Sequence, residues 1–272
     1  MRSHLVMDVP FIATGIALWP AYGVAPIAAL AATSALVHTW AVMNPRSSVY
    51  LRVNWRLRAD CRELALSFDD GPHPEATPRI LDLLAERGMH ATFFPIGRNI
   101  AGNEALLRRI HAEGHRVGLH SFSHSRLFNC WPRRRVRQDL EANGAAIADA
   151  LGVEPPVLWR PPVGLKNPIV AFVAGEMGLT AVTWTARGLD TRRHVTSARI
   201  LARLRRAVAP RAILALHDGH EPEHPRDPSH TVAATAALLP ILHAAGLPSR
   251  AMVAEARGVV AARGRSRERP VV

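Results

Sequence analysis

Cysteine is nearly absent from this chain, which has only Cys61 and Cys130 among its 272 residues. Two cysteines cannot form a framework of several disulfides, and they cannot supply the three or four thiolates of a structural zinc site. A metal site in this protein must therefore use carboxylates and histidines, of which the chain has 14. The length suits one large domain or two small ones.

Lysine is also nearly absent: Lys166 is the only one, so arginine supplies almost all of the positive charge behind a formal net charge of +12. A basic balance of this size is typical of proteins that meet nucleic acid or an anionic membrane surface. No segment interleaves basic and aromatic residues in the way nucleic-acid binders do, so a nucleic-acid partner is the weaker interpretation. The apolar share of 48% excludes a disordered chain.

Charged side chains are missing from the whole stretch between Pro10 and Pro45. One bilayer span needs about 20 apolar residues, so this stretch is too long for one span and short for two. We expect a helical hairpin with arms at Val9–Tyr22 and Ala25–Met43. Residues typical of a turn gather between the arms: Pro20, Gly23 and Pro26. One tilted, kinked span is the second interpretation, and a signal peptide, with its shorter apolar core of about 7–15 residues, is the third.

Arginine is concentrated directly after the apolar stretch, in a segment that we take as a basic juxtamembrane linker, residues 46–62. Its charged residues are Arg46, Arg52, Arg56, Arg58, Asp60 and Arg62. Basic residues next to a span favour the cytoplasmic side, so a hairpin would keep the rest of the chain in the cytosol, at the inner membrane. A single span would place the rest of the chain outside the cytosol, against that rule. The remaining interpretation is that residues 46–62 are only a solvated linker.

From Glu63 onward, short apolar runs typical of buried strands alternate with longer amphipathic runs typical of helices. The expected strands are Glu63–Phe68, Ala91–Ile96, Val117–His120, Val157–Trp159, Leu179–Trp184, Ala212–Leu216 and Ser249–Val253. The expected helices are Thr77–Arg87, Asn103–Glu113, Arg133–Leu151, Pro168–Met177, Ser197–Val208 and Val232–Ala245. This alternation predicts an α/β fold of about seven parallel units closing into a barrel-like sheet. The domain would occupy residues 63–255, followed by an arginine-rich tail at 256–272.

Polar residues follow nearly every predicted strand, at the edge where a parallel barrel places its active site. Asp69 and Asp70 follow the first strand, and His120 and His124 follow the third. Two histidines four residues apart share one face of a helical turn and can bind one metal. A carboxylate completes a three-ligand site with a position open for water. The alternatives are a plain Asp-Asp-Gly-Pro turn and two unrelated histidines.

Five segments in this order resemble the motifs of the polysaccharide deacetylase family, carbohydrate esterase family 4. Ser67–Pro72 is similar to the family's Thr/Ser-Phe-Asp-Asp-Gly-Pro motif. His120–His124 is similar to its His-Ser/Thr-x-x-His motif, and Leu216–Asp218 to its Leu-His-Asp motif. The resemblance runs from Glu63 to about Val253 and implies a distorted seven-stranded (β/α) barrel.

Two of the five motifs depart from the family pattern. Arg160–Gly164 is similar to Arg-x-Pro-aromatic-Gly, but Val163 replaces the aromatic residue. The fourth motif is matched only by Asp190, because Thr191 stands where tryptophan is usual. The first change removes a ring that could stack on a sugar, and the second reshapes the wall of the pocket, so both affect the expected substrate more than the expected reaction.

The resemblance also implies a role for each matched residue. Asp70, His120 and His124 would hold a divalent metal, Zn²⁺ as first choice, which would polarise an amide carbonyl and activate a water. The general base would be Asp69, paired with Arg160. The general acid would be His217, oriented by Asp190. The backbone N–H of Val163 would help to hold the oxyanion. The substrate contacts would be Pro161, Pro162 and Leu216.

These expectations describe a metal-dependent hydrolase that removes an N-acyl group, acetyl or formyl, from an amino sugar. Two substrates compete: an extracellular polymer such as peptidoglycan or a chitin-like glycan, and a lipid-linked sugar used at the inner leaflet in envelope biosynthesis. The expected hairpin favours the lipid-linked sugar. The alternative of a different class is a catalytically inactive, membrane-anchored glycan-binding protein.

Overall fold

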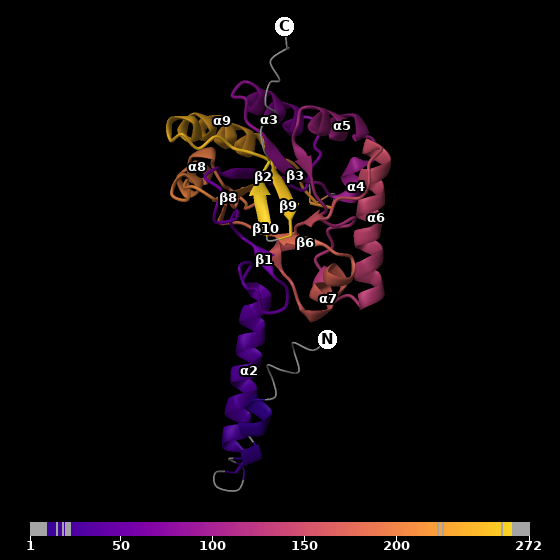
Figure 1. Ribbon diagram of the computed structural model, residues 1–272, viewed down its shortest axis with the longest axis vertical. Helices are drawn as coiled ribbons and strands as arrows, with labels where there is room; N and C mark the ends of the chain where they lie inside the picture. Colours follow the sequence, from indigo (N-terminus) through magenta and orange to yellow (C-terminus); the bar gives the residue numbers. More distant parts are fainter. Residues whose placement is uncertain are drawn as a thin grey trace.

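The computed structural model describes residues 10–14, 16, 17, 19, 23–221, 223, 224, 226–256 and 258–262. Helix α2, Ala25–Met43, projects away from a folded unit of helices and strands (Figure 1). Its 19 residues extend over about 28 Å at ~1.5 Å per residue, close to the ~30 Å hydrocarbon thickness of a bilayer. Apolar side chains are exposed along it, including Leu36 at 71% and Trp40 at 56%. Within the described ranges, it is the one helix long and apolar enough to cross a membrane.

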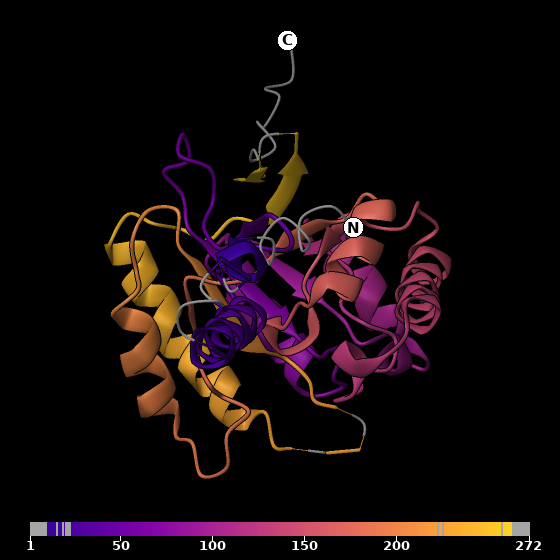
Figure 2. The ribbon, with the colours of Figure 1, turned by 90° about the horizontal axis from the view of Figure 1, so that it is seen from below.

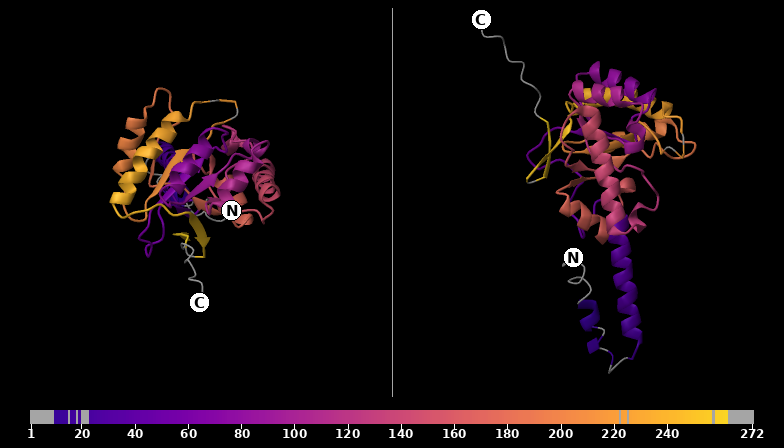
Figure 3. Two further views of the ribbon diagram at one scale, coloured as in Figure 1. Left: turned by 90° about the horizontal axis from the view of Figure 1, so that it is seen from above. Right: turned by 90° about the vertical axis from the view of Figure 1, so that its right-hand side faces the viewer.

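The second arm of the expected hairpin has the same bounds as α2. The first arm, Val9–Tyr22, lies partly outside the described residues. From its described part, Phe11, Ile12 and Ile16 line one apolar groove together with side chains of α2. Figure 3 shows this part of the chain alongside α2.

A five-stranded parallel sheet lies at the centre of the folded unit, in the order β4-β3-β2-β8-β7. Its strands are β2 (Ala65–Asp69), β3 (Ala91–Phe94), β4 (Arg116–Val117), β7 (Ala186–Arg187) and β8 (Ile213–His217). All residues of β2 are buried, as expected for a parallel strand covered on both faces. The register places Asp69 opposite Phe94 on one side and His217 on the other. The carboxyl ends of the central strands therefore meet at one edge of the sheet.

A second parallel sheet has the order β1-β6-β5, with β1 (Val53–Asn54), β5 (Leu158–Trp159) and β6 (Thr180–Val182). Two connections join it to the first sheet. Leu119 pairs with Trp159, which continues the run from β4 to β5, and the chain passes directly from β6 to β7. The predicted α/β fold is confirmed. The described parallel strands form two sheets instead of one closed barrel ladder, and β4 and β5, where the Leu119–Trp159 bridge links the two sheets, are each only two residues long.

Helices cover both sides of the central sheet (Figure 2). Helices α8 and α9 pack together on one side, and α5, α6 and α7 lie on the other. The helices of the folded unit are α3 (Ala76–Ala85), α4 (Gly97–Ile100), α5 (Glu104–Ala112), α6 (Arg133–Leu151), α7 (Pro168–Glu176), α8 (Ser197–Arg205) and α9 (Ser229–Ala244). Short 3₁₀ turns lie at Phe128–Cys130 and Pro162–Gly164. Each of the six expected helices is found, because the spacing of apolar residues selects the buried face; in α3, Ile80, Leu81 and Leu84 are fully buried.

The segment expected as a basic linker, residues 46–62, contributes to the folded unit. Val53 in β1 pairs with Ala181 in β6, and Leu57 is almost fully buried. At the other end, β9 (Met252–Glu255) and β10 (Gly258–Ala261) form an antiparallel hairpin. Strands β1 and β10 therefore lie outside the expected domain of residues 63–255. Strands this short show no hydrophobic period that the sequence could reveal.

The folded unit holds the carboxyl end of α2. Lys166 is buried, and its Nζ donates a hydrogen bond of 2.8 Å to the carbonyl oxygen of Asn44, the residue that caps α2. Arg46 donates a hydrogen bond to the carbonyl oxygen of Thr185. Burial lowers the pKa of Lys166 to about 8. A cation at a helix carboxyl terminus stabilises the helix dipole, so Lys166 joins α2 to the loop after β5.

Candidate active site

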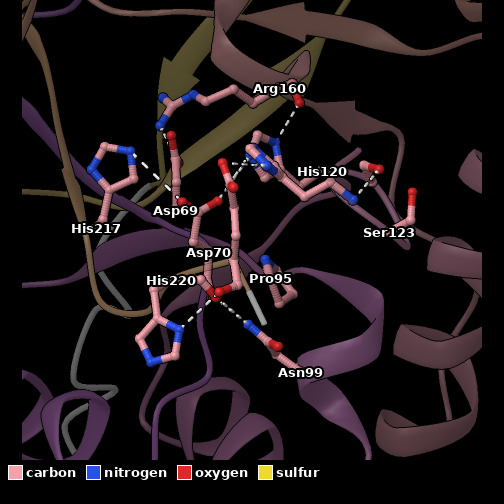
Figure 4. A network of polar contacts seen from close by, with 12 residues as sticks. Asp69, Asp70, Pro95, Asn99, His120, Ser123, Arg160, His217 and His220 are labelled. Carbon is pink, nitrogen blue, oxygen red and sulfur yellow. Dashed lines mark hydrogen bonds and ion pairs between the residues drawn. The ribbon is translucent and has the colours of Figure 1, made fainter. Parts of the chain in front are cut away.

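The two acidic residues at the end of β2 belong to one tight turn. Asp69 ends the strand, whereas Asp70 has a φ of 70°, a conformation uncommon for a residue other than glycine. Asn99 holds this turn by donating its Nδ2 hydrogen to the carbonyl oxygen of Asp70 at 2.7 Å (Figure 4). Glycine is needed at position 219, because a Cβ there would lie 2.2 Å from the same carbonyl oxygen. The loop after β8 therefore packs directly on the Asp70 turn.

Asp70, His120 and His124 form a buried group with the composition of a metal site. Their candidate ligand atoms lie within 4.8 Å of one another. Oδ1 of Asp70 is 3.3 Å from Nε2 of His120 and 3.5 Å from Nε2 of His124. Burial alone would raise the pKa of Asp70, but the facing histidines outweigh it and hold the pKa well below its ordinary value.

The chemistry of this donor set fits a divalent cation. Oδ1 of Asp70 is buried and accepts no hydrogen bond from any described residue. Nδ1 of His120 lies 2.7 Å from the carbonyl oxygen of Arg160, which selects the tautomer that leaves Nε2 free as a ligand. One carboxylate and two imidazoles are the ligands of many catalytic zinc sites. The structure thus brings together the three residues expected from the sequence.

Helix α6 fixes the loop that carries both histidines. Asp139 accepts hydrogen bonds from the hydroxyls of Ser121 and Ser123 at 2.5 and 2.6 Å, and also from the backbone N–H groups of residues 122 and 123. Asn143 accepts a hydrogen bond of 2.7 Å from the backbone N–H of His120. Sequence reasoning missed both residues, because they lie within a helix that reads as amphipathic and carry no motif.

Asp69 is paired with a fully buried arginine. Nη1 of Arg160 is 2.6 Å from Oδ1 of Asp69 and 2.9 Å from the hydroxyl of Ser67. The guanidinium also donates to the carbonyl oxygen of Thr183 at 3.1 Å and lies 4.3 Å from the centre of the Phe94 ring. A buried pair of this kind holds the carboxylate in one orientation.

His217 is paired with the carboxylate of Asp190. Nδ1 of His217 is 2.9 Å from Oδ1 of Asp190, and Oδ2 accepts hydrogen bonds from the backbone N–H of His217 and from Thr231. Burial alone would lower the pKa of His217, but Asp190 outweighs it and raises the pKa to about 10. Nε2 of His217 faces Asp70, at 4.0 Å from its Oδ2. A protonated imidazole therefore points toward the candidate metal ligands.

One cavity of about 160 Å³ joins these groups. Its lining includes Asp69, Asp70, His120, His124, Val163, Thr191 and His217. Val163 is half exposed at 52% and has a φ of 58°, and no described residue accepts a hydrogen bond from its N–H. The three expected substrate contacts are not among the residues that line this cavity: Pro161 and Pro162 are buried, and Leu216 lies in the hydrophobic core.

Three charged residues of the cavity were missed by sequence reasoning: Glu221, Arg187 and Arg226. Glu221 lies 3.4 Å from Nδ1 of His124 and 3.5 Å from Arg126. Arg187, at the end of β7, stacks on Trp184 at 5.3 Å. None of the three belongs to a motif, and only the folding of distant loops brings them to the cavity.

Comparison with known proteins decides the family. A sequence model of the family described as "Polysaccharide deacetylase" matches residues 56–182. The chain is also 35% identical over 202 residues to a chitooligosaccharide deacetylase of Bradyrhizobium sp. (strain ANU 289), a match that covers 72% of this chain and 91% of the relative. The chain belongs to the polysaccharide deacetylase family. The resemblance expected from the five motifs is thus confirmed, and the enzyme is an amidohydrolase of non-peptide carbon–nitrogen bonds.

Two further matches agree with this membership. The enzyme is 33% identical over 196 residues to a peptidoglycan-N-acetylglucosamine deacetylase of Bacillus cereus, covering 71% of this chain and 88% of the relative. Among solved structures, a family 4 carbohydrate esterase from Streptomyces lividans in complex with acetate aligns with a TM-score of 0.65 at 28% identity, over 75% of this chain and all of that one. The enzyme therefore shares the α/β fold of these deacetylases.

Proposed function

We propose that this enzyme is a metal-dependent hydrolase that removes an N-acetyl or N-formyl group from an amino sugar. One observation carries the proposal: a buried Asp-His-His group shares a cavity with the Asp69–Arg160 pair and with His217 and its partner Asp190. The relatives named as chitooligosaccharide and peptidoglycan deacetylases support an amino-sugar substrate. A catalytically inactive glycan-binding protein is not favoured, because the proton-transfer groups of a hydrolase are all present.

Each step of the proposed reaction is assigned to particular residues of the chain. A divalent cation held by Asp70, His120 and His124 would polarise the amide carbonyl and lower the pKa of a nearby water. Asp69, held in place by Arg160, accepts the proton of the water that attacks the carbonyl carbon.

Two further groups act as the carbon–nitrogen bond breaks. His217 donates its Nε2 proton to the departing amine nitrogen, while Asp190 holds Nδ1 and favours the protonated ring. The N–H of Val163 donates to the carbonyl oxygen as negative charge develops there.

We propose a lipid-linked amino sugar as the substrate, presented at the membrane surface. The carboxyl end of α2 lies against the wall of the active-site cavity, which supports this choice. Lys166, which follows Val163 by three residues in the chain, donates a hydrogen bond to Asn44 at the end of α2. Gly164 lies next to Pro45, because a Cβ added at position 164 would be 3.2 Å from the Cβ of Pro45. Any lipid bilayer around α2 would therefore lie near the loop that carries Val163. A polymer substrate remains the second candidate, supported by the names of the relatives.

For the membrane arrangement, we propose that residues 1–45 anchor the enzyme in the inner membrane as a helical hairpin. The catalytic domain would then face the cytosol, since basic residues follow α2. The catalytic domain would span residues 63–255 together with the flanking strands β1 and β10. A reporter fused after Val272 tests this topology: a fusion active only in the periplasm would overturn it.

The function is tested with the full chain purified in detergent. Bound metal is quantified, and amine release is measured on N-acetylated and N-formylated amino sugars, supplied as free glycans and as lipid-linked sugars, with and without a chelator. We expect near-stoichiometric divalent metal, amine release that the chelator abolishes, and the highest rate on a lipid-linked sugar. If the enzyme binds no metal even after Zn²⁺ is supplied, the proposed mechanism is wrong.

Replacing Asp190 with asparagine is expected to shift the pH profile. The pKa of His217 lies near 10 because of Asp190, so removing that charge lowers the pKa. A general acid is lost as the pH rises through its pKa, and the alkaline limb of kcat/KM should therefore move to lower pH in Asp190→Asn. The control is Asp149→Asn, on an exposed position of α6. An alkaline limb at the same pH in Asp190→Asn and wild type would show that His217 is not the acid that limits the rate.

A further inference from the structure

A groove of about 720 Å³ adjoins the active-site cavity, and it is lined largely by basic side chains. We call it the arginine groove. Its basic lining residues are Arg126, Arg192, Arg193, His194, His224, Arg226 and His230. Thr191 and Arg226 line both the groove and the catalytic cavity, so the two spaces meet at these residues. The arginine groove is thus positioned to receive a part of the substrate that lies beyond the reacting amide.

The acidic residues of the groove are engaged with other partners. Asp190 is bound to His217 and Thr231. Glu223 pairs with Arg98 at 2.6 Å, and Asp227 accepts hydrogen bonds from Ser229. Within the described part of the chain, no carboxylate comes within ion-pair distance of the three arginines that remain: Arg192, Arg193 and Arg226. These three arginines therefore lack a carboxylate partner among the described residues.

Arg187 extends this charge into the catalytic cavity. It lines the cavity beside Asp69 and His217, is only partly exposed, and among the described residues has no ion-pair partner. Its contact is the face of Trp184. Burial and the nearby Arg192 lower the pKa of Arg187, as expected for positive charges that repel one another. Asp190 and Asp69 relieve this repulsion only in part, and both are hydrogen-bonded elsewhere, Asp69 to Arg160 and Asp190 to His217.

A small residue opens the passage between the two spaces. Thr191 directly follows Asp190 and is followed by Arg192 and Arg193, so the segment that orients the general acid also lines the groove. Threonine leaves room there that a large ring would fill. A neutral sugar chain would gain little from a row of unpaired guanidinium groups, whereas a phosphate oxygen accepts strong, charge-assisted hydrogen bonds from them.

We propose that the arginine groove, with Arg187 at its inner end, binds a phosphate group attached to the sugar whose N-acyl group is removed. The inference rests on the proposed function and specifies its substrate as a phosphorylated amino sugar. The phosphate belongs either to a soluble sugar phosphate monoester or to the diester of a lipid-linked sugar, since both offer the same oxygens to arginine.

The test uses the full chain in detergent micelles and three matched substrates. These are an N-acetyl amino sugar with a free anomeric hydroxyl, the same sugar as its 1-phosphate, and the same sugar joined through a phosphodiester to a polyprenyl chain. We expect kcat/KM to be about tenfold or more higher for the phosphorylated sugars than for the neutral one, because hydrogen bonds to a charged group contribute strongly. Equal preference for both phosphorylated sugars indicates recognition of the phosphate itself, and preference for the diester alone indicates the lipid-linked source.

The variant is the double substitution Arg192→Gln and Arg193→Gln. It should raise KM for the phosphorylated sugars and reduce their advantage to about threefold or less, with kcat/KM for the neutral sugar unchanged. The matched control is Arg205→Gln with Arg206→Gln, an adjacent exposed pair at the end of α8 outside the groove, which should keep the full advantage.

An independent readout is the binding of inorganic pyrophosphate by calorimetry, which should be weakened about tenfold or more in the groove variant and unchanged in the control. Equal kcat/KM on neutral and phosphorylated sugars, or an advantage that survives the groove substitutions, overturns this inference and leaves the deacetylase function intact. Failure to release amine from any of the three sugars overturns the proposed function, and the inference with it.

Discussion

Replacing Asp69 with asparagine is expected to lower kcat by about 10²–10⁴-fold, the usual contribution of a general base. Asparagine keeps an oxygen for the hydrogen bond from Arg160 but cannot accept the proton of the attacking water. Asp69 is outside the group of candidate metal ligands, so the bound metal should remain near the wild-type amount. Amine release and metal content are measured on the same preparation, which separates loss of the base from loss of the site.

The control for this substitution is again Asp149→Asn, the same chemical change on an exposed helix position. Thermal stability is also expected to fall in Asp69→Asn, because Arg160 keeps its buried charge without a charged partner. Assays are therefore run well below the melting temperature of the variant. A variant that binds metal and retains kcat within about threefold of wild type would exclude Asp69 as the base.

Replacing His124 with glutamine is expected to remove tightly bound metal and, with it, activity. His124 supplies one of three candidate ligands, and the loss of a direct ligand should weaken metal affinity by more than the 10–100-fold typical of residues that only support a ligand. Equilibrium dialysis measures the affinity. A thermal melt gives a second readout, because metal at about 1,000 times its Kd stabilises a folded protein by about 4 kcal/mol. This stabilisation should be present in wild type and absent in the variant.

His111→Gln is the matched control, since His111 is exposed on α5 and lies outside the cluster. Excess divalent metal should partly restore activity in His124→Gln, because Asp70 and His120 remain. Full metal content in the variant at submicromolar free metal would show that the chain binds its metal elsewhere.

Local pattern accounts for most of the secondary structure. The expected helix Arg133–Leu151 has the observed bounds of α6, and it ends at Gly152, which adopts the left-handed conformation that stops helices. The apolar stretch Ala25–Met43 coincides with α2. In both cases the signal lies within one segment: a composition, a period of 3.6 residues or a stop residue.

The elements that sequence reasoning missed are those whose order depends on distant partners. Strands β1 and β7 are two residues long, too short to show any alternation, and each is a strand only because a neighbour pairs with it. The hairpin of β9 and β10 was also missed, because its second strand lies in a segment whose composition resembles an arginine-rich tail.

The candidate site divides in the same way. Asp69, Asp70, His120, His124, Arg160, Asp190 and His217 were named from short motifs, and the structure gathers all of them around one cavity. Their supports, Asp139 and Asn143, carry no motif, because a hydrogen-bond acceptor can come from any element that packs nearby. The roles of the named residues stay predictions until the variants are measured.

The sequence by itself determined the family, the donor set of the candidate metal site and the presence of a membrane-type helix, because each of these is written in contiguous residues. Only the tertiary structure decided that Lys166 ties α2 to the loop after β5, and that Arg187 and Arg226 line the catalytic cavity and Arg192 and Arg193 the adjoining groove, with no ion-pair partner among the described residues. The physical reason is that an ion pair or a contact between loops needs two segments that are far apart in the chain, so neither segment reveals it alone. Composition does not distinguish one arginine from another, whereas packing determines which arginines have a carboxylate partner.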